Sequence, residues 1–178
     1  MGRRTIISSG VFVAIAASIA LANYVLVQRQ LTGVINADKR NSGITAFAHY
    51  EYFVVPSLLV FDLRKLSGEK SPADVTRVLL QFAESMQDST FERITLSHRG
   101  RPKFFLTGKF FHTIGSEYRT QNPVYTMRTF PENVYKLDGR AAFGTWTGGW
   151  LGVIGKQMDD FNEFHRQWYI EDIARNGS

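Results

Sequence analysis

The sequence contains no cysteine. This absence excludes a disulfide framework, a thiolate metal site, a cysteine nucleophile and a lipid anchor attached through a cysteine. An exported domain without disulfides fits a bacterial envelope better than an animal secretory route. The sequence also lacks a P-loop, a G-x-G-x-x-G motif and a G-x-S-x-G motif. We therefore expect no cofactor.

A large charge of one sign is also missing. The chain has 21 basic and 16 acidic side chains, and the N-terminal Arg3 and Arg4 leave 19 basic residues for the rest, a net charge of +3. This excess is too small to predict a nucleic-acid partner. Aromatic residues, in contrast, make up 13% of the chain. Because each buried ring removes ~150–250 Å² from water, they allow a small domain to build a stable core.

An uncharged apolar run follows the two arginines. No charged residue lies between Thr5 and Gln28, and the 22 residues of Ile6–Val27 form about 33 Å of helix, enough to cross a ~30 Å hydrocarbon layer. Tyr24 suits the far interface. Since basic residues stay on the cytoplasmic side, Arg3 and Arg4 predict an N-in signal anchor in a bacterial inner membrane, with the rest of the chain in the periplasm.

A cleaved signal peptide is the alternative. Ala20-Leu21-Ala22 has the A-x-A pattern of a cleavage site and follows a basic and an apolar region. Cleavage after Ala22 would release a periplasmic protein. The apolar run continues to Val27 and no proline or glycine stands just before the site, which favours the uncleaved anchor.

The remaining residues predict one small extracytoplasmic domain. The division is residues 1–28 as signal anchor or signal peptide, 29–43 as a polar linker, and 44–178 as a single α+β domain. We expect a mixed or antiparallel sheet with two or three amphipathic helices. The expected elements are strands at 44–55, 58–63, 92–98 and 103–107, helices at 72–87, 110–118 and 151–174, and an extended segment at 124–135.

The most distinctive predicted surface is a basic hairpin. Five basic residues occur there without an intervening acid: Arg93, Arg99, Arg101, Lys103 and Lys109. Such residues attract an anionic lipid surface by about 1 kcal/mol each, or bind an acidic partner. The alternative is that they occupy the solvent side of the hairpin while neighbouring phenylalanines fill the core.

A glycine- and tryptophan-rich segment spans residues 141–155. It is uncharged, but its 15 residues fall short of the roughly 17–25 needed to cross a bilayer. Trp146 and Trp150 are therefore candidates for contact with the membrane interface. Alternatively, the glycines allow tight packing or a kink before the last helix.

Signals of catalysis are weak. The four histidines are scattered singly, so we expect no metal site. Asp62 ends an apolar strand, where α/β enzymes often hold a carboxylate, and with His98 or His112 it is the candidate for an envelope hydrolase. The structural alternative is that Asp62 caps a turn or pairs with Arg64 or Lys65.

The sequence as a whole favours a non-enzymatic, membrane-tethered accessory or assembly protein of the cell envelope, acting through protein–protein interaction. A lipid- or small-ligand-binding envelope module, built on the aromatic interior with the basic hairpin at its mouth, is the first alternative. A hydrolase is the second.

Overall fold

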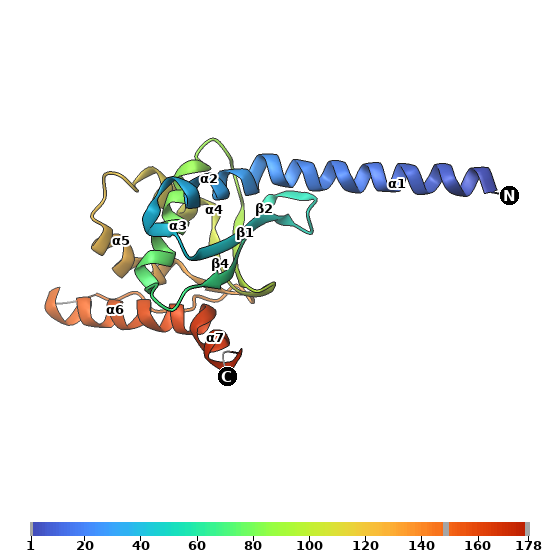
Figure 1. Ribbon diagram of the computed structural model, residues 1–178. Helices are drawn as coiled ribbons and strands as arrows, with labels where there is room; N and C mark the ends of the chain where they lie inside the picture. The colour runs from blue at the N-terminus through green and yellow to red at the C-terminus, as the bar shows by residue number, and fades with distance from the viewer. Residues whose placement is uncertain (1, 148–149, 177–178) are drawn as a thin grey trace.

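The computed structural model describes the backbone of residues 2–147 and 150–176 and the side chains of residues 13–147 and 152–175. A long helix, α1 (Gly2–Asn23), projects from one side of a body that contains a sheet and the other helices (Figure 1). The predicted fold class of that body, α+β with a mixed sheet, is confirmed.

Five strands form one sheet, and their order in space is their order along the chain. They are β1 (Ile44–Glu51), β2 (Val55–Leu66), β3 (Arg93–His98), β4 (Arg101–Thr107) and β5 (Tyr135–Lys136). β2 and β3 run parallel, whereas the other neighbours are antiparallel. Parallel strands need a crossover, and α3 (Pro72–Ser85) provides it. β1 lies at one edge of the sheet.

The helix predicted at 72–87 corresponds to α3, and its start carries a reciprocal cap. The Ser71 side chain accepts from the backbone N–H of Asp74, and the Asp74 carboxylate accepts from the N–H of Ser71 at 2.9 Å. Pro72 occupies the first turn, where its missing N–H costs nothing. This reciprocal cap satisfies two backbone donors that a helix start leaves open. The buried stripe of α3 includes Val75, Val78, Leu79 and Phe82.

The core between sheet and helices is built from aromatic rings. Phe61 of β2 contacts Phe82 of α3 and Trp168, with ring centroids 5.9 and 6.0 Å apart. Phe164 stacks on Trp168 at 5.3 Å and contacts Phe104 of β4 at 5.6 Å. All five side chains are buried. The aromatic-rich composition therefore fills the interior by ring-on-ring packing.

The remaining helical elements connect and cover the sheet. They are η1 (Tyr24–Gln28), α2 (Arg29–Ala37), η2 (Lys39–Asn41), α4 (Gly108–Ser116), α5 (Pro123–Thr129), η3 (Pro131–Asn133), α6 (Trp150–His165), η4 (Arg166–Ile170) and α7 (Glu171–Asn176). The predicted C-terminal helix thus corresponds to α6, η4 and α7 in succession.

The polar linker predicted at 29–43 is largely helical in the structure, with α2 at Arg29–Ala37 and η2 at Lys39–Asn41. α1 continues through the π-helical η1 into α2 without leaving helical geometry. An apolar stripe at four-residue spacing explains this: Val27 and Leu31 are fully buried, and Ile35 packs against the core. The polar residues that suggested a linker lie on the outer side of this helix.

The expected extended segment at 124–135 is wrong, because its first half is α5. The Asn122 side chain accepts from the N–H of Val124 at 2.9 Å, and Pro123 begins the helix. An asparagine cap followed by proline is a helix-start signal. The short length of α5 left too little apolar periodicity to reveal it.

Candidate functional site

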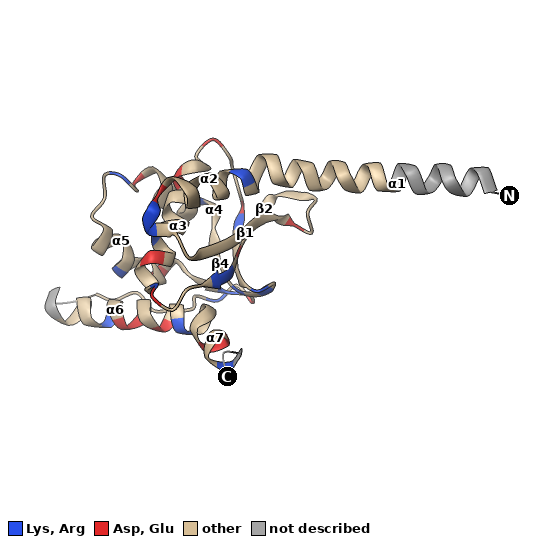
Figure 2. Cartoon of the chain, viewed as in Figure 1, with Lys and Arg blue, Asp and Glu red and all other residues tan. Residues whose placement is uncertain are grey.

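From Val13 onwards, the exposed surface of α1 is uncharged and mostly apolar. Val13, Ile15 and Leu21 are 69%, 55% and 62% exposed and point in different directions around the helix. Figure 2 shows no charged residue on the described part of this helix. A helix that is apolar on all sides is typical of apolar surroundings. Among the residues with described side chains, no helix is long and apolar enough to cross a membrane, and residues 5–12 of the predicted membrane segment lie outside that set.

Asn23, at the end of α1, fixes this helix to the body. The side chain is only 4% exposed. Its Nδ2 donates to the carbonyl oxygens of Ile19 (2.9 Å) and Phe53 (2.7 Å), and its Oδ1 accepts from the N–H of Tyr50 (2.9 Å). One polar side chain therefore bonds both the helix and the turn between β1 and β2.

Gln28 makes a second bond to the same strand. Its Oε1 accepts from the N–H of Ala48 at 2.7 Å, and its Nε2 donates to Thr32 at 3.1 Å. Alternate residues of an edge strand point their N–H groups away from the sheet, and such groups need partners. Asn23 and Gln28 supply partners for two of them, at Tyr50 and Ala48. The helix thus covers the edge of β1.

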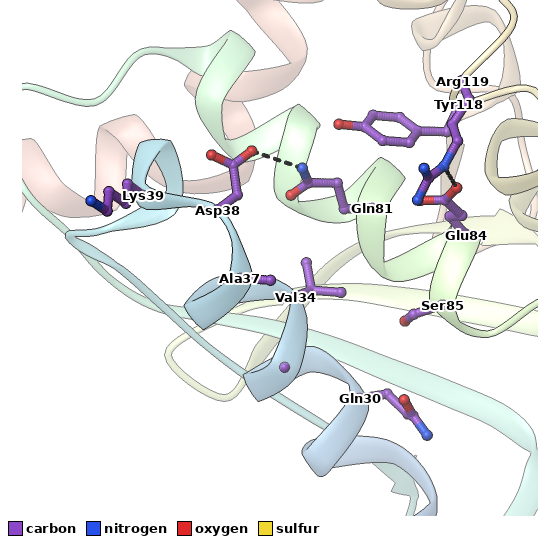
Figure 3. A pocket seen from close by; sticks show the side chains of 11 residues that line it. Gln30, Val34, Ala37, Asp38, Lys39, Gln81, Glu84, Ser85, Tyr118 and Arg119 are labelled. Carbon is purple, nitrogen blue, oxygen red and sulfur yellow. Dashed lines mark hydrogen bonds and ion pairs between the residues drawn. The ribbon is translucent and has the colours of Figure 1, made fainter.

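A groove of about 720 Å³ opens between α2 and α3, and its lining begins at Gln30, two residues after Gln28. Figure 3 shows α2 on one side and α3 on the other, with Tyr118 and Arg119 from the segment after α4 completing the rim. On the α2 side, Gly33, Val34 and Ala37 are small, and Gln30 is the longer side chain. The groove is lined by Gln30, Gly33, Val34, Ala37, Asp38, Lys39, Gln81, Glu84, Ser85, Tyr118 and Arg119.

The carboxylates at this groove are paired within the chain. Asp38 accepts hydrogen bonds from Arg40 (2.6 Å) and Gln81 (2.9 Å), which hold the pKa of the Asp38 carboxyl well below its usual range. Glu84 forms an ion pair with Arg119. With these charges satisfied, the groove offers hydrogen-bonding groups and small apolar surfaces, which suit a peptide segment better than a free ion.

The basic hairpin does not form one patch. Arg93 pairs with Glu51 at 2.6 Å and lies over the Phe105 ring, and Lys103 pairs with Asp172 at 2.8 Å. Lys103 and then His98 are the hydrogen-bond donors that lower the pKa of the Asp172 carboxyl. Two of the five predicted surface cations are therefore used in ion pairs within the domain.

The other three lie at opposite ends of the hairpin. Arg99 and Arg101 are exposed at the β3–β4 turn, whereas Lys109 is exposed at the start of α4, beyond the far end of β4. The seven residues of β4 separate these ends by about 20 Å. The structure does not bring them together.

The tryptophans of the glycine-rich segment have different outcomes. Trp146 is half-buried, donates from Nε1 to Asp160 at 2.6 Å and has the Lys156 ammonium 4.5 Å from its ring centre. These contacts hold it against α6. The side chain of Trp150 lies outside the described residues, so interface contact by the pair stays a prediction.

Asp62 follows the structural alternative. Both carboxylate oxygens accept from the N–H of Gly100, at 3.1 and 3.0 Å, and Arg64 pairs with it at 2.5 Å. Gly100 lies in the β3–β4 turn with a φ of 80°. Asp62 therefore caps a neighbouring turn.

The histidines of the hydrolase hypothesis are not beside Asp62. Asp62 pairs in register with Ser97, and the next residue, His98, points to the opposite face of the sheet. His98 is buried and contacts the Asp172 carboxylate at 3.1 Å. His112 is exposed on α4. The three candidate residues do not converge. Among the described residues no cluster of three or more metal-ligand side chains occurs.

Two buried polar side chains, His165 and Tyr169, were not among the candidate site residues. His165 is fully buried with Nε2 3.0 Å from the Thr76 hydroxyl, and burial lowers the pKa of its imidazole to about 3. Nδ1 of His165 and the hydroxyl of Tyr169 have no hydrogen-bond partner among the described residues.

Asn23 and Gln28, which fix the N-terminal helix to β1 and its turn, were also missed, although the sequence marks them as unusual. They are polar side chains inside or at the end of an apolar run. Tyr52, Phe53 and Val54 were missed as well, although three large residues in succession at a turn are unusual.

No protein-family model matches this sequence, and no curated protein or solved structure matches it either.

Proposed function

We propose that this chain is a membrane-tethered, extracytoplasmic accessory or assembly protein of the cell envelope that acts by binding a protein partner. The observation that carries the proposal is α1, whose apolar side chains are exposed while Asn23 and Gln28 fix its end to the domain. A large exposed apolar surface usually meets lipid or protein. Insertion of α1 into a bilayer would remove this surface from water.

The basic start of the sequence supports an N-in orientation. Arg3 and Arg4 precede the apolar run, and basic residues remain on the cytoplasmic side of a bacterial inner membrane. The domain then lies in the periplasm. Cleavage after Ala22 is the alternative route to the same compartment.

The α2–α3 groove is the surface we propose for the partner. It adjoins the helix that joins the tether to the domain, and its acidic side chains are already paired. The groove therefore suits an extended or helical peptide segment of another envelope protein.

Membrane fractionation tests the tether. Full-length protein expressed in a Gram-negative bacterium is expected to stay with the membrane after extraction at alkaline pH, and protease added to spheroplasts should digest the domain. N-terminal sequencing of the mature protein identifies the contrary outcome. A soluble chain that begins at Asn23 contradicts the anchor and supports cleavage.

Site-directed photocrosslinking tests the partner groove. A photoreactive amino acid at the exposed Ser85 should give a discrete adduct in living cells, and Gly33→Arg should remove it by filling the groove. Neither Gly33 nor Gly155 has an atom within 4 Å of an added Cβ, so Gly155→Arg on α6 is the matched control. An adduct that persists in Gly33→Arg, or that contains only this chain, contradicts a heterologous partner in the groove.

The interior-ligand alternative loses support from the packing of the core. It requires the aromatic side chains to line a binding cavity, but Phe61, Phe82 and Trp168 are buried against one another. The hydrolase alternative loses support because both oxygens of Asp62 are engaged by Gly100.

A further inference from the structure

The turn between β1 and β2 exposes three consecutive large apolar residues. Tyr52, Phe53 and Val54 are 77%, 44% and 57% exposed. Turns normally carry glycine, asparagine, aspartate, serine or proline, because those residues suit the backbone and water. Formation of the turn alone therefore does not explain these three residues.

The backbone of the turn makes the choice of residues more unusual. Tyr52 and Phe53 have φ angles of 52° and 65°, in the left-handed region that favours glycine and asparagine. The N–H of Val54 donates to the carbonyl of Glu51 at 3.3 Å, which closes the turn. Two aromatic residues are thus kept where the local conformation disfavours them. Strained backbone of this kind is commonly found at functional positions.

The turn is held beside the point where α1 leaves the domain. Asn23 Nδ2 donates to the Phe53 carbonyl at 2.7 Å. The helix runs antiparallel to β1, since Gln28 bonds Ala48 and the earlier Asn23 bonds Tyr50. α1 therefore continues past the turn in the direction in which the hairpin points, as Figure 1 shows.

The length of α1 sets the level of the turn relative to a bilayer. The uncharged part of α1 runs for 19 residues from Thr5 to Asn23, so it extends for about 28 Å, close to the ~30 Å thickness of a hydrocarbon layer. If α1 spans the membrane, Asn23 lies at the far interface together with the turn bonded to it. Tyrosine is enriched at that level, and both Tyr24 and Tyr52 are exposed there.

We propose that Tyr52–Phe53–Val54 is a second membrane contact, which inserts into the extracytoplasmic interface of the bilayer beside α1. This inference rests on the proposed tether. The tether and the turn together give the domain two points of attachment, which fix its orientation on the membrane surface. The basic residues Arg99 and Arg101 then face away from the membrane, because they lie at the opposite end of β3 and β4.

The absence of cysteine makes a clean experiment available. Tyr52→Cys in the full-length chain is labelled with an environment-sensitive fluorophore and reconstituted into phosphatidylethanolamine–phosphatidylglycerol vesicles. Val54→Cys is the second position, and Leu137→Cys is the control, since Leu137 is an exposed apolar residue in the turn after β5, toward the other end of the sheet. Tryptophan fluorescence on heating checks that each labelled protein is folded.

We expect a blue-shifted emission at positions 52 and 54 but not at 137. Quenching should be stronger with nitroxide lipids labelled near the head group than with lipids labelled at the chain end. Water-exposed emission at 52 and 54 in protein that resists alkaline extraction overturns the inference and leaves the tether intact. A blue shift without lipid quenching also overturns it, because protein then covers the turn. Extraction at alkaline pH overturns the tether and this inference together.

Discussion

Replacing Asn23 with alanine tests whether the N-terminal helix and the domain form one folded unit. The asparagine side chain bonds the N–H of Tyr50 and the carbonyl of Phe53, two backbone groups of the β1–β2 hairpin. Alanine removes both bonds and leaves every side chain of η1 and α2 unchanged. The matched control is Ser18→Ala, because Ser18 bonds only Ala14 within the exposed part of α1.

The size of the effect follows from those two bonds. A hydrogen bond contributes about 0.5–1.5 kcal/mol net to the free energy of unfolding, and more when the group left behind is buried. Alanine is favoured over asparagine in a helix by roughly 0.5 kcal/mol, which offsets part of the loss. We expect Asn23→Ala to lower the free energy of unfolding by about 1–2 kcal/mol, or the Tm by about 3–6 °C in a chain of this size. Ser18→Ala should cause no loss.

Two measurements on the full chain in detergent micelles check this reasoning. Thermal unfolding, followed by the fluorescence of the buried Trp168, gives the stability difference. Amide hydrogen exchange then reports each bond: the Tyr50 amide should lose protection in Asn23→Ala, while the Ala48 amide, bonded to Gln28, should keep it. Unchanged exchange at Tyr50 would refute the docking of the helix on β1, whatever the change in Tm.

Three further predictions concern the stability of the domain. Burial lowers the pKa of His165 to about 3, so between pH 6.5 and 3 the unfolded chain binds more protons than the folded chain, and stability decreases as the pH is lowered. Urea unfolding should show a loss of about 2 kcal/mol from pH 7 to pH 5 that is absent in His165→Leu. Because an added Cβ at Gly108 would lie 1.6 Å from the Phe91 carbonyl oxygen, Gly108→Ala should cost more than the ~1–3 kcal/mol of ordinary overpacking, whereas Gly33→Ala, in open space, should gain up to ~1 kcal/mol in the same thermal assay. Tyr169→Phe should leave the Tm unchanged or higher, since its buried hydroxyl has no partner among the described residues; a clear decrease would reveal a missing interaction.

The elements predicted best from the sequence were those with local signals. The helix predicted at 72–87 and the hairpin strands predicted at 92–98 and 103–107 depend on residues a few positions apart, so short-range rules suffice. The helix at 29–37 was missed because its stabilising face becomes visible only when Val27 and Leu31 are known to pack against the sheet. Tertiary packing outweighed a polar local composition there.

The candidate site was harder to predict because it depends on long-range pairing. Asn23 meets Tyr50 and Phe53 across about 30 residues of chain, and no spacing rule connects them. The basic hairpin failed as a single surface for the same reason: Glu51 and Asp172, distant in sequence, pair with Arg93 and Lys103. Charge runs show which residues are cationic, but the fold decides which of them remain available.

Because Asn23 itself bonds the β1–β2 hairpin, the fold of the domain and its attachment to a membrane depend on different residues. If a peptidase cleaved after Ala22, the chain would begin at Asn23 and the bonds to Tyr50 and Phe53 would still be within reach. The domain would then keep its fold but lose nearly all of the apolar helix. Three turn residues bury far less surface than a spanning helix, and even a single acyl chain gives only marginal membrane binding. Attachment to a membrane therefore depends on the residues before Asn23, whereas the orientation of the attached domain depends on the turn that follows β1.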